Sequence, residues 1–117
     1  MASRQRVEQK LEELISRLDG GNGQVRESLR DSLPEPRVLS VHLTDLQATY
    51  WARLDEGRMG ELRPDEPEEA HIRITVSSDD LIDLLDGRQS LLPAVFLGRI
   101  KVDASPADLM RLRRLLV

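Results

Sequence analysis

Near the N-terminus, apolar residues recur every three or four positions, and charged residues fill most of the positions between them. The apolar residues are Val7, Leu11, Leu14, Ile15 and Leu18. This spacing gives an α-helix one apolar stripe and predicts an amphipathic helix packed against a core. A glycine-rich turn at 20–23 predicts its end. Apolar residues at four-residue steps from Val25 to Leu33 predict a short second helix, which Pro34 closes.

From Arg37 onward, apolar and polar residues alternate, which is the pattern of a strand with one buried face. The apolar positions of this first strand are Leu39, Val41 and Leu43. A second strand is expected at Thr49–Leu54, then a hairpin turn at Asp55–Arg58 and a short return strand near Met59–Leu62.

The segment Arg63–Glu69 contains two prolines and four acidic residues, and it predicts an exposed crossover loop. Alternation returns at His71–Val76 and again around Ile100–Val102, which predicts two more strands. Because short turns join consecutive strands, antiparallel pairing is favoured. We therefore expect one α+β domain over residues 1–117, with a five-stranded, mainly antiparallel sheet and helices packed on one face.

The second half also carries clear helix boundaries. Ser77 is a suitable N-cap for a helix over Ser78–Leu85, and Gly87 suits the position just after its end. Ser105 and Pro106 begin the final helix by the same N-terminal chemistry.

The segment Ser90–Leu97 is apolar at almost every position. Pro93 fits a helix only in the first turn, which places the N-cap near Ser90, and Gly98 ends the helix. A helix that is apolar on nearly every side is expected to be buried on nearly every side. Two interpretations stay open: the segment is sandwiched between the sheet and the final helix, or it lines an internal apolar cavity.

Composition narrows the classes of function. The net charge of −4 argues against non-specific electrostatic binding of nucleic acid. The sequence has no cysteine, which removes disulfides, thiolate nucleophiles and cysteine metal sites. We find no run of about 18 apolar residues that could span a membrane, and the charged N-terminal helix lacks the apolar core of a secretory signal. We therefore expect a cytoplasmic protein.

Candidate catalytic residues are few. His42 and His71 are the two imidazoles, and both fall at solvent-facing positions of alternating strands, where a surface or cross-strand role is favoured over catalysis or metal binding. Asp79, Asp80 and Asp108 fall in first turns of helices, where they oppose the helix dipole. Since no nucleophile and base can be paired, we expect no enzyme activity.

The ordered motifs from His71 onward resemble the sterol carrier protein 2 (SCP-2-like) family. They are the strand Ile72–Val76, the capped helix Ser78–Leu85 with Gly87, the apolar helix Leu91–Leu97, the run Gly98-Arg99-Ile100-Lys101 and the closing helix Ala107–Leu116. The upstream half is compatible with the same family. The chain departs from it by ending in Arg-Leu-Leu-Val, without a peroxisomal address, by a short closing helix, and by one phenylalanine and no methionine in the apolar helix.

The resemblance implies an apolar tunnel between sheet and helices that takes sterols, fatty acids or fatty acyl-CoA. It also implies no catalytic residues, no metal and no cofactor. By position, the residues expected to line the tunnel are Leu81, Leu84, Leu85, Leu92, Val95, Phe96, Ile100, Leu109, Met110, Leu112 and Leu116.

The sequence thus favours binding and transfer of a hydrophobic lipid, with release gated by the final helix. The alternative is a protein-interaction or dimerisation module, working with a second copy or a partner enzyme, whose core is filled. Arg111, Arg113 and Arg114 in the final helix either complement its dipole or contact the anionic surface of a membrane.

Overall fold

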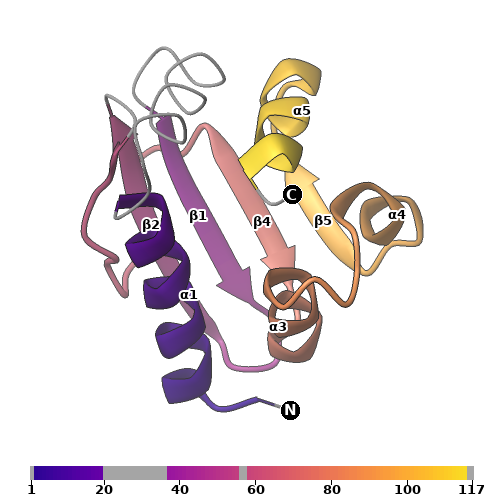
Figure 1. Ribbon diagram of the computed structural model, residues 1–117, viewed down its shortest axis with the longest axis horizontal. Coiled ribbons are helices and arrows are strands. Elements are labelled where there is room, and N and C mark those ends of the chain that lie inside the picture. The colour runs from indigo at the N-terminus through magenta and orange to yellow at the C-terminus, as the bar shows by residue number, and fades with distance from the viewer. Residues whose placement is uncertain (1, 20–36, 56–57, 116–117) are drawn as a thin grey trace.

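The computed structural model describes residues 2–19, 37–55 and 58–115 (Figure 1). The elements, in chain order, are α1 (Arg4–Asp19), β1 (Arg37–Leu43), β2 (Ala48–Asp55), β3 (Arg58–Met59), β4 (Ile72–Val76), α3 (Ser78–Leu85), α4 (Leu91–Phe96), β5 (Ile100–Asp103) and α5 (Pro106–Leu115). The short helix predicted between Val25 and Leu33 lies outside the described residues.

The strands form one five-stranded sheet in the order β3-β2-β1-β4-β5, which confirms the predicted α+β class. Three neighbouring pairs are antiparallel, and the central pair of β1 and β4 is parallel. The predicted return strand is shorter than expected. It stops at Met59, and the chain rejoins β2 through a bridge between Trp51 and Arg63.

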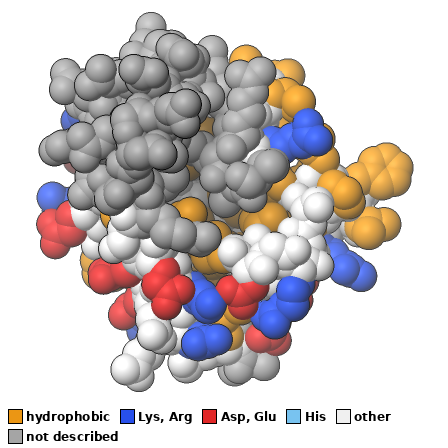
Figure 2. Space-filling model, in the orientation of Figure 1, with side chains coloured by type: hydrophobic (Ala, Val, Ile, Leu, Met, Phe, Trp, Pro, Cys, Tyr) orange, Lys and Arg blue, Asp and Glu red, His pale blue; other side chains and the backbone are white. Residues whose placement is uncertain are grey.

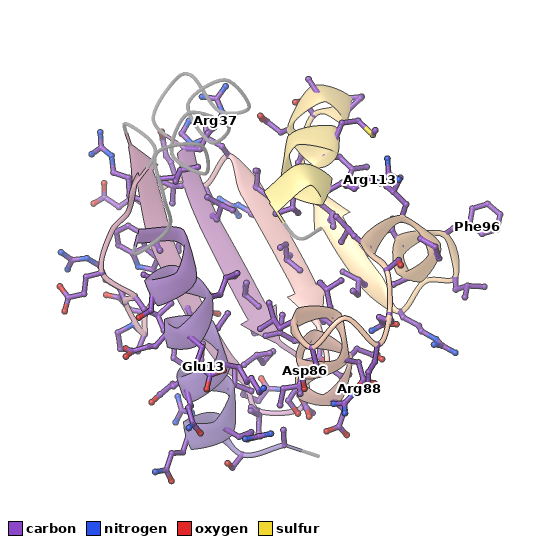
Figure 3. The ribbon with its side chains drawn as sticks, in the orientation of Figure 1. Glu13, Arg37, Asp86, Arg88, Phe96 and Arg113 are labelled. Atoms are coloured by element: carbon purple, nitrogen blue, oxygen red, sulfur yellow. The ribbon has the colours of Figure 1, made fainter. Side chains whose placement is uncertain are left out.

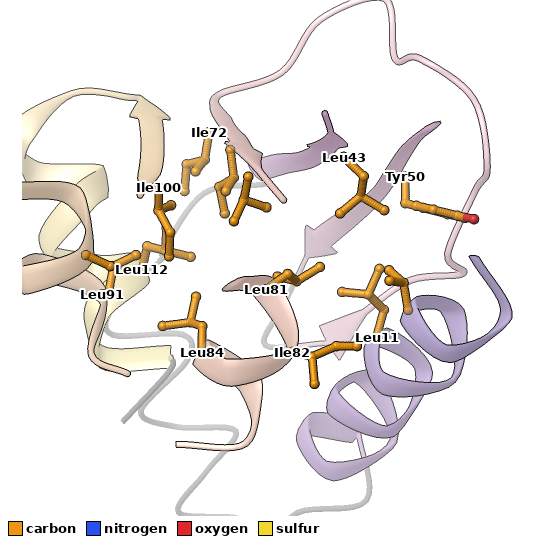
Figure 4. Close-up of a cluster of buried hydrophobic side chains, with 14 of the residues drawn as sticks. Leu11, Leu43, Tyr50, Ile72, Leu81, Ile82, Leu84, Leu91, Ile100 and Leu112 are labelled. Atoms are coloured by element: carbon orange, nitrogen blue, oxygen red, sulfur yellow. The ribbon is translucent and has the colours of Figure 1, made fainter. Parts of the chain in front are cut away.

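One face of the sheet carries the apolar side chains. In β1, Leu39, Val41 and Leu43 lie beside Ala52, Tyr50 and Ala48 of β2 and beside Ile72, Ile74 and Val76 of β4. Helices α1, α3 and α5 lie on one face of the sheet (Figure 1). Buried residues of α1, α3 and α5, including Leu11, Leu81 and Leu112, join those of the sheet in a single hydrophobic cluster (Figure 4).

The predicted helix boundaries are confirmed by the hydrogen bonds at their ends. The Ser77 side chain accepts a hydrogen bond from the backbone N–H of Asp80 at 3.2 Å, and the Ser105 side chain accepts one from Asp108 at 3.1 Å. Ser90 occupies the N-cap of α4 as expected, although its side chain makes no capping bond. Gly87 and Gly98 follow α3 and α4 with φ of 78° and 77°, a conformation that glycine adopts without steric cost.

The expectation that α4 is buried on nearly every side is wrong. Leu91 and Ala94 are buried, whereas the side chains of Phe96 and Leu97 are 91% and 66% exposed. The reason is the position of α4, which lies beyond the β5 edge of the sheet rather than over its face (Figure 1). A helix at an edge has neighbours on one side, so its remaining sides meet solvent.

Candidate functional site

A small apolar cavity lies between the sheet and the helices. It is partly open to the surface, and its volume is about 80 Å³. Among the described residues, the sheet contributes Leu39, Val41, Tyr50, Trp51, Ala52 and Ile74; α1 contributes Leu11, Leu14 and Ile15; α3 contributes Leu81, Leu84 and Leu85; and Leu62 and Leu112 also line the cavity. With almost no polar surface along this wall, the cavity suits hydrocarbon.

The burial of β1 points to the same space. Leu39 and Val41 belong to a central strand, and their side chains are on the face that the helices cover. In a closely packed interior such side chains are fully buried, as Leu43 is at 0% exposure. Leu39 and Val41 are only half-buried, and both border the cavity.

Tyr50 places its one polar group outside the apolar wall. Its ring is buried, and its hydroxyl donates a 2.6 Å hydrogen bond to Glu8 Oε1 of α1. Burial, with a smaller contribution from the Glu8 carboxylate, raises the pKa of Tyr50 above its ordinary value. The phenol therefore stays neutral at physiological pH, and its hydrogen bond fixes α1 to β2.

A mostly buried ion pair holds α5 against the start of β1. Arg37 Nε donates to Asp108 Oδ1 at 3.3 Å, and the two side chains are 16% and 11% exposed. Asp108 is in the first turn of α5, and Leu112, one turn further on, faces the cavity. The pair therefore positions one part of the cavity wall.

Polar contacts also hold both ends of α3, one to α1 and one to the turn between β1 and β2. Lys10 Nζ lies 2.6 Å from Asp86 Oδ1, and this hydrogen bond lowers the pKa of the Asp86 carboxyl. Asp45, in the turn between β1 and β2, accepts hydrogen bonds from the backbone and side chain of Ser78 at the start of α3. These contacts anchor the helix that carries Leu81, Leu84 and Leu85.

Four of the predicted lining residues do line the cavity: Leu81, Leu84, Leu85 and Leu112. Ile100 is buried in the core, Val95 and Leu109 pack against it, and Leu92 is half-buried on α4. Phe96 and Met110, at 91% and 45% exposure, face solvent instead, and Figure 3 shows Phe96 pointing away from the sheet. Leu116 lies outside the described residues.

Sequence reasoning missed the contribution of the first half of the chain. The stripe on α1 and the alternation of β1 identify Leu11, Leu14, Leu39 and Val41 as inward-facing residues. Those signals give the inward face but not which inward residues border a cavity, because that depends on how far apart α1 and α3 sit.

The two histidines take structural positions. His42 Nδ1 lies 2.9 Å from Thr49 Oγ1, on the neighbouring strand, and His71 Nδ1 accepts a hydrogen bond from the backbone N–H of Val38 at 3.0 Å. Among the described residues, no group of three His, Cys, Asp or Glu side chains could hold a metal ion. None of the described helices is long and apolar enough to cross a membrane.

Comparison with known protein families identifies one that matches this chain. The sequence model of the SCP-2 sterol transfer family matches residues 3–117. No curated protein matches the sequence.

Solved structures share the fold. A sterol carrier protein domain 2 of Helicoverpa armigera has a TM-score of 0.70 and 19% identity, covering 98% of this chain and 90% of that one. A palmitated SCP2L2 of Aedes aegypti has a TM-score of 0.66 and 12% identity, covering 94% and 93%. The sec-alkylsulfatase Pisa1 of Pseudomonas sp. has a TM-score of 0.68 and 17% identity, covering 88% of this chain and 14% of the sulfatase. The fold thus occurs both in small proteins and in part of a large enzyme.

Proposed function

The chain belongs to the SCP-2 sterol transfer family, and from this premise we propose that it binds the hydrocarbon part of a lipid in the apolar cavity and releases it chemically unchanged. The observation that carries the proposal is the incomplete burial of Leu39 and Val41 at the centre of the sheet. Side chains at such positions are normally covered, so their partial exposure beside the cavity supports a binding role over a purely structural one.

The lining favours recognition by hydrophobic burial alone. The described residues of the cavity wall present almost no polar surface, so none of them can pair with a carboxylate, a hydroxyl or a phosphate inside the cavity. Burying such a group without a partner is costly. The head group of the ligand therefore stays at the opening, and the alkyl part enters, gaining about 25 cal/mol for each Å² of apolar surface buried.

The size of the cavity favours an acyl chain over a rigid ring system. Its 80 Å³ are room for about three groups the size of a water molecule, while pockets for whole ligands typically hold about 300–1,000 Å³. Entry of a ligand therefore requires the helices to move apart. A fatty acid or fatty acyl-CoA can enter one methylene at a time, whereas a sterol needs the full width at once. The palmitated relative from Aedes aegypti supports the same ligand class.

Helix α5 is the element that we expect to move. It contributes Leu112 to the wall, and it is held to β1 by the ion pair of Arg37 and Asp108. Displacing α5 widens the cavity while leaving the pairing of the strands intact. This assigns the gating of release to the final helix.

A transfer function needs no catalytic group, and we propose that the protein is not an enzyme. Within residues 2–19, 37–55 and 58–115, both imidazoles are engaged on the sheet, His42 with Thr49 and His71 with Val38.

The small volume favours a second candidate, an interaction or dimerisation module whose interior is filled. Native mass spectrometry of protein purified without detergent separates the two after incubation with palmitate, palmitoyl-CoA and cholesterol. We expect a complex with one palmitate per chain that dissociates on denaturation. A protein mass unchanged by all three lipids, whether monomer or dimer, would exclude lipid transfer and favour the filled module.

A cavity-filling variant tests where the ligand binds. Ala52 lines the cavity and is 6% exposed, so Ala52→Leu inserts an isopropyl group into the space. We expect palmitate binding to weaken at least roughly tenfold, because the added group occupies much of the volume. Ala107→Leu, at an exposed position on α5, is the matched control and should bind palmitate as the native chain does. Equal binding by both variants would place the ligand elsewhere.

A further inference from the structure

The end of α4 exposes two large apolar side chains next to each other. Phe96 is 91% exposed and Leu97 is 66% exposed, and we call this pair the apolar tip. Figure 3 shows Phe96 projecting away from the sheet, and Figure 2 shows hydrophobic side chains projecting at the edge of the molecule where α4 lies. At such exposure neither side chain contributes appreciably to the core, so the fold does not explain them.

The backbone holds the apolar tip in a fixed position. The N–H of Gly98 donates to the carbonyl of Val95 at 3.1 Å, and that of Arg99 donates to the carbonyl of Ala94 at 2.9 Å. With Gly98 at φ 77°, these two bonds form a Schellman motif, which closes the helix end with its carbonyls satisfied. The same segment is tied to the core through buried Leu91 and Ala94. The two apolar side chains are thus presented by an ordered turn.

The charge around the apolar tip is positive, in contrast to the whole chain. Residues 87–102 contain Arg88, Arg99 and Lys101 and no acidic residue, while the chain carries a net charge of −4. Arg88 is engaged by Asp83 and Asp86. Arg99 and Lys101 are exposed, and their side chains make no ion pair or hydrogen bond with another described residue. Lys and Arg side chains flank the projecting hydrophobic ones in Figure 2.

We propose that the apolar tip, with Arg99 and Lys101, docks on a lipid bilayer that carries anionic head groups. Apolar side chains flanked by cations bind such an interface by inserting among the acyl chains while the cations contact the phosphates. The remaining surface, with its excess of acids, is repelled by the same membrane. The opposition of charge therefore orients the molecule with α4 toward the lipid.

Two features favour a bilayer over a protein partner. The apolar tip is convex and comprises two side chains, whereas a stable protein interface covers about 800 Å² on each partner. A membrane needs no matching pocket, and insertion of a few apolar groups with nearby cations gives reversible binding. Reversible contact is what a protein that loads and unloads at a membrane requires.

Co-sedimentation of the full chain with vesicles tests the proposal. The vesicles are phosphatidylcholine alone or phosphatidylcholine mixed with phosphatidylglycerol, and no ligand is added, so the result does not depend on the function of the cavity. We expect binding to the mixed vesicles. The double variant Phe96→Ser with Leu97→Ser should bind the mixed vesicles with an affinity at least roughly tenfold lower. Replacing Arg99 and Lys101 by glutamine should weaken binding by roughly fivefold for each cation at low salt.

Met110→Ser is the matched control, since Met110 is 45% exposed on α5, and it should bind the mixed vesicles as the native chain does. Every variant should unfold at the same temperature as the native chain, which would show that its fold is intact. Equal vesicle binding by the native chain and the Phe96–Leu97 double variant overturns the proposal, as does absence of binding by the native chain. Sedimentation velocity adds one further outcome: a dimer that the same double variant dissociates would identify the apolar tip as a protein contact and also overturn it.

Discussion

The ion pair of Arg37 and Asp108 connects the start of β1 to the first turn of α5, across 71 positions of the sequence. We predict that it acts as a latch for the final helix. The perturbations are Arg37→Gln, Asp108→Asn and the two together. Each single substitution removes one charge and keeps a polar side chain, and Asp108→Asn also keeps the shape.

The magnitude follows from the geometry. At 3.3 Å, two unit charges attract by about 5 kcal/mol at an effective dielectric constant of about 20. Desolvation offsets much of this, because the side chains are 16% and 11% exposed. Each single substitution should lower the free energy of unfolding by about 1.5–3 kcal/mol, the contribution of a hydrogen bond between charged groups at a mostly buried position. The coupling energy of the pair should be about 1–2 kcal/mol.

Urea denaturation of the native chain, both single variants and the double variant gives that coupling energy directly. The cycle is needed because Asp108 also opposes the dipole of α5, and this contribution cancels between the two arms. A coupling energy below about 0.3 kcal/mol would refute the latch.

The functional consequence is measured separately, as the rate at which bound palmitate moves from the protein to vesicles. Both single variants should release palmitate faster, because less free energy holds α5 and Leu112 in place. Normal release despite a clear coupling energy would show that the pair stabilises the fold without gating the cavity.

Two further predictions concern the ends of the helices. The hydrogen bond from the Ser78 side chain is the main cause that lowers the pKa of Asp45 below 3.8, so Asp45 stabilises the fold above its unfolded pKa and loses this effect as the pH falls through the folded one. Unfolding free energies measured across the acid range should therefore fall less steeply for Asp45→Asn than for the native chain. Gly98→Ala should cost about 1 kcal/mol in urea denaturation, from the backbone alone, because φ is 77° and the added Cβ meets no atom within 4 Å. A midpoint of urea denaturation equal to that of the native chain would contradict the positive φ at Gly98.

Much of the fold could be predicted where the cause lies within a few residues. Ser77 and Ser105 mark helix starts because their hydroxyls accept from a backbone N–H three positions ahead. Gly87 and Gly98 mark helix ends because the turn requires a positive φ. Alternation in β1 predicted its inward face, since successive side chains of a strand point to opposite sides.

The site was predicted less completely, and the error at α4 shows why. Its sequence contains almost no polar residues, which predicts burial. Whether Phe96 is covered, however, depends on where α4 lies relative to the sheet, and this position depends on the order of the strands. The residues Leu81, Leu84 and Leu85 of α3, which lies over the sheet face, border the cavity, whereas Phe96 at the end of α4 faces solvent.

The sequence by itself determined the class of the fold, the ends of its helices, the aliphatic character of its interior and its membership of the family, because these rest on local backbone chemistry and on patterns along the chain. Tertiary structure alone decided that β1 pairs in parallel with β4, that Asp108 meets Arg37, and that Leu39 and Val41 border a cavity. Those outcomes join residues far apart in the chain. They depend on which of several apolar surfaces pack together. A hydrophobic pattern predicts that a side chain is buried, but it does not predict which other side chains it packs against.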